Sequence, residues 1–363
     1  MPTHSIVAYL LFFSLLGVLS WAYAKDKNSR PIGVVLLFIL LTLFSGLRFG
    51  LGRDFSMYLN AYEYYPNYVS LQFMEPLWQK IYGLFHLFEA GYTTLQLAVA
   101  GATVGLAMRA FGKLSLNFII ALVSFVIIYH GYFESMNLMR QVLAMMVVLA
   151  FFNWYLERRY WSFLGALILA VLFHTSAVFM VPLLLITRVK PSRQIMAIAL
   201  LGSLMVGTPL LNAIIEAAQG VLPERYGNYL LEGKVSAAEK SSGIYLVFLN
   251  ALTLYFIWQE KKLRKLHEPT GLYTRMLFWG VVIYNCTLSF EVGMRLMFYP
   301  LMFIYPLLAN SFELDKGERN RLVILLALSL FFLFEVKNLT NPQEPYSKYQ
   351  TIFHHFSYNP LVW

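Results

Sequence analysis

Charge is what this sequence lacks most. Only 13% of its 363 residues are Asp, Glu, Lys or Arg, whereas 59% are hydrophobic. Soluble domains carry about a quarter charged residues. A chain this long with so little charge cannot cover itself with a polar surface. The composition therefore predicts a polytopic membrane protein of all-α class, with residues 1–363 forming a single integral membrane domain.

The sequence has a single cysteine and lacks the familiar catalytic motifs. The lone Cys286 excludes a disulfide framework and a cysteine metal site. The chain has no nucleophile elbow, HExxH motif, P-loop or GxGxxG motif. The scattered histidines give no ligand set, so we expect no metal and no cofactor. The N-terminus lacks a basic region before its apolar run, which favours a retained first span over a cleaved signal.

Apolar runs are abundant. A spanning helix needs roughly 17–25 mostly apolar residues. This rule predicts spans near Ser5–Ala24, Ile32–Leu47, Thr94–Ala110, Leu114–His130, Met139–Leu156, Gln194–Leu211, Ile244–Trp258, Leu272–Phe290, Arg295–Asn310 and Arg321–Val336. The run Tyr160–Leu185 is interrupted at His174 and is read as one span or as two short ones.

The basic residues are distributed unevenly between the connections. Most of the 28 Lys and Arg residues fall in the segments 25–30, 109–113, 158–159, 188–193, 261–275 and 316–321. The positive-inside rule places these segments in the cytoplasm. They alternate consistently only if Tyr160–Leu185 crosses twice, which gives about 12 transmembrane helices. The segments 50–93 and 212–243 and the tail 337–363 then face outside. No cytoplasmic segment carries a DxD-like pair for a nucleotide sugar.

Five arginines remain on the face that should be poor in positive charge. Singly, an arginine at a membrane edge snorkels or pairs. Together they indicate a site for an anion such as a lipid diphosphate, because guanidinium groups bind phosphate strongly. The five are Arg48, Arg53, Arg140, Arg225 and Arg295.

The stretch Leu47–Tyr65 is the densest of these outer-face segments. A helix beginning after Arg53 and ended by Pro66 would align Asp54 and Tyr58 on one face. That face is either a sugar-binding surface with one carboxylate or an interfacial aromatic belt. Glu75-Pro76 then opens an interfacial helix, in which Glu75 could be a simple helix cap.

Further polar residues begin or interrupt the later spans. Asn137 and Arg140 share a helical face, and Tyr299 lies four residues after Arg295. His174 lies within an apolar run, where an ionisable residue is a functional candidate. It could instead satisfy backbone groups at a hairpin turn.

These elements together resemble the EpsG family of Wzy-like bacterial polysaccharide polymerases. The matching motifs are Arg48 with Gly52-Arg53-Asp54 and Tyr58, Glu75, Asn137 with Arg140-Gln141, Phe173-His174-Thr175-Ser176-Ala177, Arg225-Tyr226 and Pro345-Tyr346. The resemblance covers nearly the whole chain. It departs from the family at Pro76, where glycine is more usual.

The resemblance implies a GT-C-type glycosyltransferase in the bacterial cytoplasmic membrane. Such an enzyme joins oligosaccharide repeat units on undecaprenyl diphosphate, as donor and acceptor, at the outer face. It implies no nucleic-acid partner and allows a protein that regulates chain length. On this basis we expect His174 or Asp54 as the base, with His174 preferred because imidazoles titrate near neutrality.

The other roles follow from the same expectation. Arg140, Arg225 and Arg295 would stabilise the leaving diphosphate, and Arg48 and Arg53 would hold the second one. Glu75, Asn137 and three tyrosines would bind substrate: Tyr58, Tyr226 and Tyr299. The alternatives are a flippase of lipid-linked sugars, an O-antigen ligase-like transferase and a membrane acyltransferase. The acyltransferase lacks a visible cytoplasmic thioester site.

Overall fold

The chain divides into two compact units. The computed structural model describes residues 2–128, 130–218, 243–288, 291–314 and 318–354. Unit 1 comprises Met1–Ala177 with Leu328–Trp363, and unit 2 comprises Val178–Ala327. Both units are built from helices, and α18 (Glu318–Thr340) has residues in each.

Unit 1 is a bundle whose helices are joined by short connections. Two segments in it, β1 (Arg48–Phe49) and β2 (Gln350–Thr351), pair as an antiparallel ladder. Its helices are α1 (Thr3–Lys25), α2 (Arg30–Gly46), α3 (Phe55–Glu63), α4 (Pro76–Leu87), α5 (Tyr92–Leu114), α6 (Phe118–Ile127), α7 (Met139–Ala150), α8 (Phe152–Leu156) and α9 (Tyr160–Phe173), with 3-10 turns η1 (Val69–Phe73), η2 (Glu134–Met136) and η4 (Ile352–His354).

Small residues bring α2 and α5 close together. A Cβ on Gly46 would lie 2.9 Å from the Cα of Leu97, so only glycine permits this approach. On α5, Gly101 faces Thr42 and Gly105 faces Phe38. Glycines four residues apart on one helix face are typical of such close packing between membrane helices.

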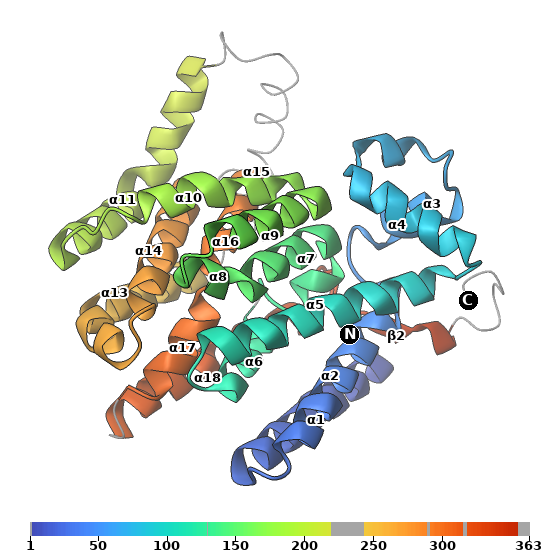
Figure 1. The fold of residues 1–363 in the computed structure, drawn as a ribbon, viewed down its shortest axis with the longest axis horizontal. Helices are drawn as coiled ribbons and strands as arrows, with labels where there is room; N and C mark the ends of the chain where they lie inside the picture. Colours follow the sequence, from blue (N-terminus) through green and yellow to red (C-terminus); the bar gives the residue numbers. More distant parts are fainter. Residues whose placement is uncertain (1, 129, 219–242, 289–290, 315–317, 355–363) are drawn as a thin grey trace. The chain divides into compact units, whose positions relative to one another are not determined.

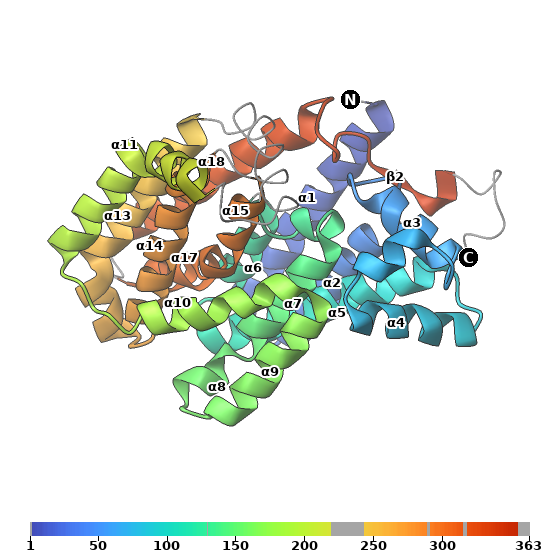
Figure 2. The ribbon, with the colours of Figure 1, turned by 90° about the horizontal axis from the view of Figure 1, so that it is seen from above.

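Two short helices extend from this bundle. In Figures 1 and 2, α3 and α4 lie beside the N-terminal end of α5. The helix expected after Arg53 is α3, and the helix expected from Glu75-Pro76 is α4, with Pro76 in its first turn. Their buried faces share an apolar cluster that includes Tyr58, Tyr62 and Trp78.

The tail packs onto the first two helices of unit 1. Ile352 donates its N–H to the Leu47 carbonyl, and Tyr9 donates to the Tyr346 carbonyl at 2.6 Å. The ring of Tyr349 stacks on Phe44 at 4.2 Å between centroids. The tail from Pro345 to Ile352 is therefore part of the core of unit 1.

Unit 2 is also helical and encloses a polar cluster. In this cluster Asn250 and Asn285 each donate a hydrogen bond to the other, at 2.9–3.0 Å. Asn285 also donates to Ser203. The helices are α10 (Met180–Ile186), α11 (Arg193–Ala218), α13 (Gly243–Leu266), α14 (Thr270–Cys286), α15 (Glu291–Leu296), α16 (Phe298–Leu301), α17 (Ile304–Phe312) and the start of α18; η3 (Thr175–Phe179) leads into it.

The predicted span Arg295–Asn310 is interrupted in the structure. The segment is broken into α15, α16 and α17. The breaks fall near Met297 and at Met302–Phe303. Pro300 and Pro306 explain them, because a proline lacks an N–H and its ring clashes with the carbonyl four residues earlier.

The remaining spans predicted from hydropathy correspond to observed helices. The interruption at His174 is confirmed, because α9 ends at Phe173 and His174 is extended. The run Leu114–His130 contains a shorter helix, α6, which Asn117 caps by accepting from the Ile120 N–H at 3.1 Å. Whether residues 160–187 cross the membrane once or twice stays a prediction, as does the total of about 12 spans.

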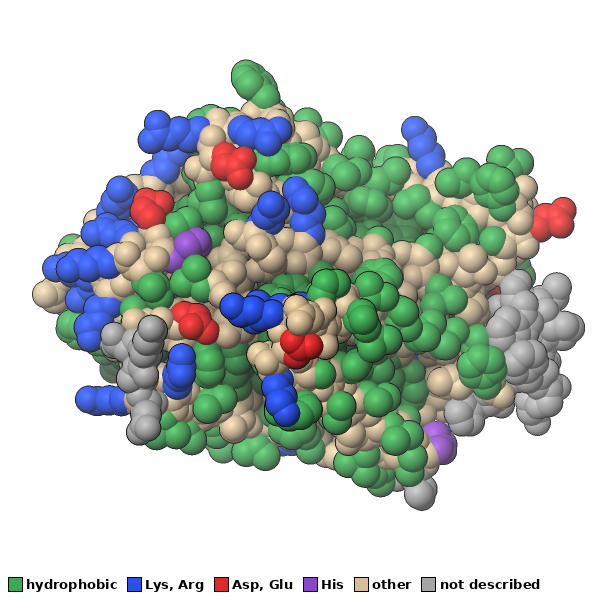
Figure 3. Space-filling model, turned by 60° about the horizontal axis from the view of Figure 1, so that its bottom comes forward, with side chains coloured by type: hydrophobic (Ala, Val, Ile, Leu, Met, Phe, Trp, Pro, Cys, Tyr) green, Lys and Arg blue, Asp and Glu red, His purple; other side chains and the backbone are tan. Residues whose placement is uncertain are grey.

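Apolar surface supports a membrane setting. Within the described ranges, five helices are long and apolar enough to cross a membrane: His4–Lys25, Tyr92–Leu114, Met139–Leu156, Arg193–Leu210 and Arg319–Thr340. Shorter apolar helices accompany them, and hydrophobic side chains cover much of the face shown in Figure 3. The prediction of a helical membrane protein is confirmed at this level.

Candidate active site

Glu75 is the centre of a polar network inside unit 1. Its Oε1 accepts from His174 Nδ1 at 2.7 Å and from the Thr175 N–H at 3.1 Å. Its Oε2 accepts a charge-assisted bond from Arg140. One carboxylate thus connects residues from three segments that are far apart in the sequence.

The local fold explains how these groups meet. Pro76 starts α4 directly after Glu75, which leaves the carboxylate at the beginning of the helix. Arg140 lies in the first turn of α7, and His174 follows the last residue of α9. The buried indole of Trp78 donates to the Phe173 carbonyl at 2.9 Å, which fixes the end of α9 beside α4.

Exposure differs among the three charged or ionisable side chains. The exposed fraction is 6% for Glu75, 16% for Arg140 and 24% for His174. His174 is therefore the member most accessible to a substrate. The Glu75 carboxylate is enclosed, so it can influence a bound substrate only through His174 and Arg140.

The electrostatics keep Glu75 ionised. Burial raises the pKa of this carboxyl, but the hydrogen bond from His174 and the Arg140 charge outweigh burial and lower the pKa to about 2. An ionised Glu75 accepts from Nδ1, so the neutral imidazole carries its proton there. Its other ring nitrogen, Nε2, is then the acceptor that can take a proton.

Tyr58 completes the network behind Arg140. Arg140 Nε donates to the Tyr58 hydroxyl at 3.4 Å, and the guanidinium lies 5.7 Å from the ring centroid. Burial raises the pKa of Tyr58, so the phenol is neutral. Tyr58 is 3% exposed and orients the arginine rather than presenting its ring to a sugar.

A second set of polar contacts holds the turn between β1 and α3. The Asn137 side-chain oxygen accepts from the N–H of Arg53 at 2.8 Å and of Asp54 at 3.3 Å, and its amide donates to Glu134 at 3.1 Å. Gly52 has a φ of +100°, and a Cβ there would lie 2.9 Å from the Met136 carbonyl. Asn137 therefore positions the Gly52-Arg53-Asp54 turn.

Arg48 and Arg53 have different environments. Arg48 is 2% exposed and donates to two backbone carbonyls. One is that of Ser45, and the other is that of Met136, at 3.1 Å from the guanidinium nitrogen. A substrate would reach its guanidinium only by displacing these carbonyls. The Arg53 side chain is 45% exposed and lies 3.9 Å from Glu344, a weak surface pair.

The remaining predicted site residues lie in unit 2 or outside the described residues. Arg295 follows in α15 and the buried Tyr299 in α16, both in unit 2. Arg225 and Tyr226 lie outside the described residues. Among described residues, no group of three His, Cys, Asp or Glu side chains is close enough to hold a metal ion.

Sequence reasoning missed several contributors. It gave no role to Trp78, to the Thr175 N–H or to Glu134, whose Oε2 accepts from Tyr346 at 2.9 Å. A signal for Glu134 was present, because a carboxylate in an apolar stretch three residues before Asn137 needs a donor. The Trp78 and Thr175 contacts carry no local signal.

The network lies at the ends of helices remote from the basic connections. His174 follows the C-terminal end of α9, whereas Arg158 and Arg159 precede its N-terminal end. Likewise α5 begins next to α4 and ends at Lys113 and Leu114. Within unit 1, the network and the basic residues are therefore separated along the helix axes.

Fold and site together define a helical membrane protein with an enzyme-like histidine, carboxylate and arginine network at its helix ends. The chain belongs to the EpsG family, which matches residues 32–351 and so includes every member of the network. This is a family of Wzy-like polymerases, which indicates a glycosyltransferase-like polysaccharide polymerase acting on lipid-linked sugars. No curated protein and no solved structure matches the chain.

Proposed function

We propose that this protein joins oligosaccharide repeat units carried on undecaprenyl diphosphate, at the outer face of the bacterial cytoplasmic membrane. The growing chain is the donor, and the terminal sugar hydroxyl of a new lipid-linked unit is the acceptor. The observation that supports this most is the Glu75 network, because it orients a solvent-accessible imidazole beside a guanidinium.

The chemistry divides between these two groups. The acceptor hydroxyl oxygen attacks the anomeric carbon of the donor, and its proton passes to His174 Nε2. The bond from that carbon to the diphosphate oxygen breaks, and the diphosphate leaves with the electron pair. The leaving group needs charge stabilisation, which Arg140 supplies from the N–H groups that Glu75 and Tyr58 do not use.

Glu75 has a positioning role in this mechanism. Its ionised carboxylate fixes the proton on Nδ1 and stabilises the imidazolium that forms when Nε2 accepts the hydroxyl proton. It also holds the Arg140 guanidinium in one orientation. Thus a single buried charge presents both the base and the anion-binding group.

The other arginines have separate proposed roles. The exposed Arg53 contacts the second diphosphate, while Arg48 stabilises the turn before α3 through backbone carbonyls. Arg225 and Arg295 are proposed to contribute to diphosphate stabilisation on the sequence argument. Asp54 is the alternative base, and Tyr226 and Tyr299 are proposed substrate contacts on the same basis.

The architecture proposed for this activity is of the GT-C type, with about 12 spans and the sites facing outside. The proposed transfer uses no metal ion. A flippase of lipid-linked sugars is the principal alternative. It would need polar groups along a path across the membrane, whereas the unit 1 network is confined to one end of its helices.

The decisive experiment is incubation of the purified protein with a purified lipid-linked repeat unit. A ladder of chain lengths supports the polymerase. One product of a single addition would indicate a ligase instead, and movement across a vesicle without bond formation would indicate a flippase. Adding EDTA should leave the ladder unchanged; loss of the ladder would overturn the metal-free mechanism.

Variants separate the proposed roles. His174→Ala should lower the turnover by about 10²–10⁴-fold, the usual contribution of a general base. Arg140→Ala should abolish ladders while membrane insertion persists. Wild-type turnover of His174→Ala would rule out the base, and normal ladders from Arg140→Ala would remove its diphosphate role.

A further inference from the structure

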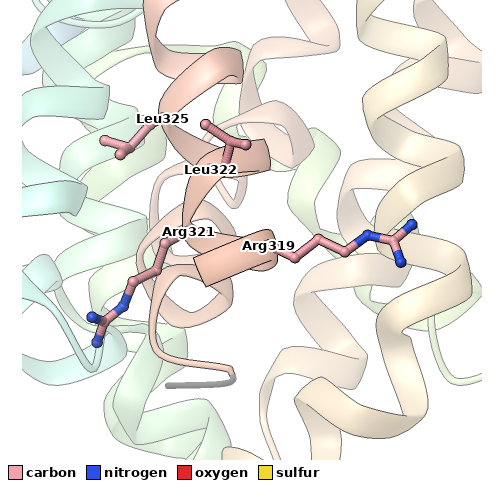
Figure 4. A pocket seen from close by; sticks show the side chains of 4 residues that line it. All are labelled: Arg319, Arg321, Leu322 and Leu325. Carbon is pink, nitrogen blue, oxygen red and sulfur yellow. The ribbon is translucent and has the colours of Figure 1, made fainter. Parts of the chain in front are cut away.

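A cavity in unit 2 combines positive charge with apolar surface. It has a volume of about 550 Å³ and is lined by Arg319, Arg321, Leu322 and Leu325 in the first turns of α18 (Figure 4). Cavities that bind small molecules usually have volumes of roughly 300–1,000 Å³. None of the Glu75 network residues lines it.

Neither arginine is neutralised by a carboxylate among the described residues. The guanidinium of Arg321 lies over the ring of Phe312, 5.3 Å from its centroid, and its buried Nε has no hydrogen-bond partner. Arg319 is exposed and forms no ion pair with a described residue. Among the described residues, the positive charge of the cavity is therefore not paired with a carboxylate.

The arrangement of the arginines argues against a small ion. Figure 4 shows the two side chains extending to opposite sides of the helix, so their guanidinium groups do not converge on one point. An inorganic phosphate is bound best by donors that converge on it. Two separated cations instead suit a headgroup of larger size.

The apolar side of the cavity continues along the helix. Leu322, Leu325 and Leu326 are 56%, 47% and 56% exposed and recur at helical spacing. The start of α18 is held in place by Tyr255, which donates to Asn320 at 3.3 Å. Charge is thus followed within one turn by a fixed apolar surface, which matches the order of groups in a phospholipid.

We propose that this cavity binds an anionic glycerophospholipid. The headgroup phosphate lies against Arg319 or Arg321, and an acyl chain lies along the three leucines. The positive-inside assignment places this end of α18 at the cytoplasmic leaflet, where juxtamembrane basic clusters recognise anionic lipids. The proposal is independent of the polymerase mechanism, because it concerns unit 2 alone.

The test is native mass spectrometry of the purified full-length protein titrated with phosphatidylglycerol or phosphatidylcholine of identical chains. We expect phosphatidylglycerol to bind at least about 10-fold more tightly. Inorganic phosphate at millimolar concentration should not displace it. Equal binding of the two lipids would overturn the proposal, and displacement by phosphate would indicate a simple anion site.

Charge-matched variants locate the site. Arg319→Gln with Arg321→Gln should remove most of the preference for phosphatidylglycerol. The control pair Arg188→Gln with Lys190→Gln removes two exposed charges elsewhere in unit 2 and should keep it. An equal loss of this preference in both variant pairs would indicate non-specific attraction of the anionic lipid and would contradict the proposed site. Equal melting temperatures in neutral detergent establish that each variant is folded.

Leu322→Ser with Leu325→Ser tests the acyl-chain contact. This pair should weaken phosphatidylglycerol binding while leaving both arginines in place. Unchanged affinity would show that the apolar surface does not take part. It would leave a headgroup-only site and contradict the proposed lipid binding mode.

Discussion

At the scale of single residues, Glu75 holds the two side chains that carry the proposed chemistry, His174 and Arg140. A buried carboxylate is costly unless its oxygens are paired. Here His174, Thr175 and Arg140 pair both oxygens. Removing the Glu75 charge should therefore disturb both the proposed base, His174, and the Arg140 guanidinium.

Glu75→Gln is the sharpest test of this positioning role. The substitution keeps the shape but removes the charge that stabilises the imidazolium, so we expect turnover to fall by about 10²–10⁴-fold. The measurement is the rate of ladder formation by the purified protein. Glu63→Gln, an exposed carboxylate on α3, is the matched control and should retain the wild-type rate. Comparable rates for the two variants would contradict the role of Glu75.

The lowered pKa of Glu75 also predicts how stability depends on pH. The folded pKa is about 2 and the ordinary value is 4.5, so ionised Glu75 stabilises the folded state fully above about pH 4.5. This contribution is lost as the pH falls toward 2. The melting temperature of wild type should exceed that of Glu75→Gln by more at pH 5 than at pH 3. A difference that is the same at both values would be inconsistent with the shift.

At the scale of helices, buried amides connect α11, α13 and α14. Asn285 is 0% exposed and Asn250 is 3% exposed, and each donates to the other. Thr208 of α11 donates to the Asn285 carbonyl at 2.7 Å. In an apolar surrounding such bonds hold helices at a defined rotation about their axes, because each amide has few other partners.

A double-mutant cycle measures this amide pair. Asn250→Leu and Asn285→Leu should each lower the free energy of unfolding by roughly 1–2 kcal/mol, since each removes two hydrogen bonds and takes the donor away from the side-chain oxygen of the partner amide. The double variant should cost less than the sum of the two. Asn28→Ala lies in the exposed connection between α1 and α2. Its effect on the free energy of unfolding should add to the effect of either Asn variant. Strict additivity within the pair would show that the exchange of bonds contributes nothing.

At the scale of the whole molecule, the apolar helices indicate a membrane protein. They do not indicate on which side of the membrane the candidate site lies. The basic connections and the Glu75 network are at opposite helix ends in unit 1. From the positive-inside rule we propose that the network faces outside. On that proposal the substrates at this site would be exported, lipid-linked sugars.

Single cysteines test the orientation. In a Cys286→Ser background, Asn67→Cys lies between α3 and α4, and Asn28→Cys lies between α1 and α2; both positions are exposed. A membrane-impermeant maleimide should label position 67 in intact cells and position 28 only after permeabilisation. The opposite pattern would place the network in the cytoplasm and remove the basis for an undecaprenyl-linked acceptor at this site.

Hydropathy and turn residues in the sequence were enough to predict most helices. The predicted interruption at His174, the helix after Arg53 and the helix from Glu75-Pro76 are all observed. These features depend on neighbouring residues, such as the length of an apolar run or a proline in a first turn. The same local reasoning did not predict the two helix breaks at 295–310, which lie near Pro300 and Pro306.

The sequence by itself determined the class of the protein, its family pattern and the residue types at the candidate site. Tertiary structure decided which of them meet. Glu75 contacts Arg140 and His174 from 65 and 99 residues away, and Arg48 is enclosed by carbonyls such as that of Met136, 88 residues away. Hydropathy is a local property, whereas the partner of a buried charge depends on how helices distant in sequence pack. Glu75 therefore changed from a possible helix cap to the group that orients the proposed base.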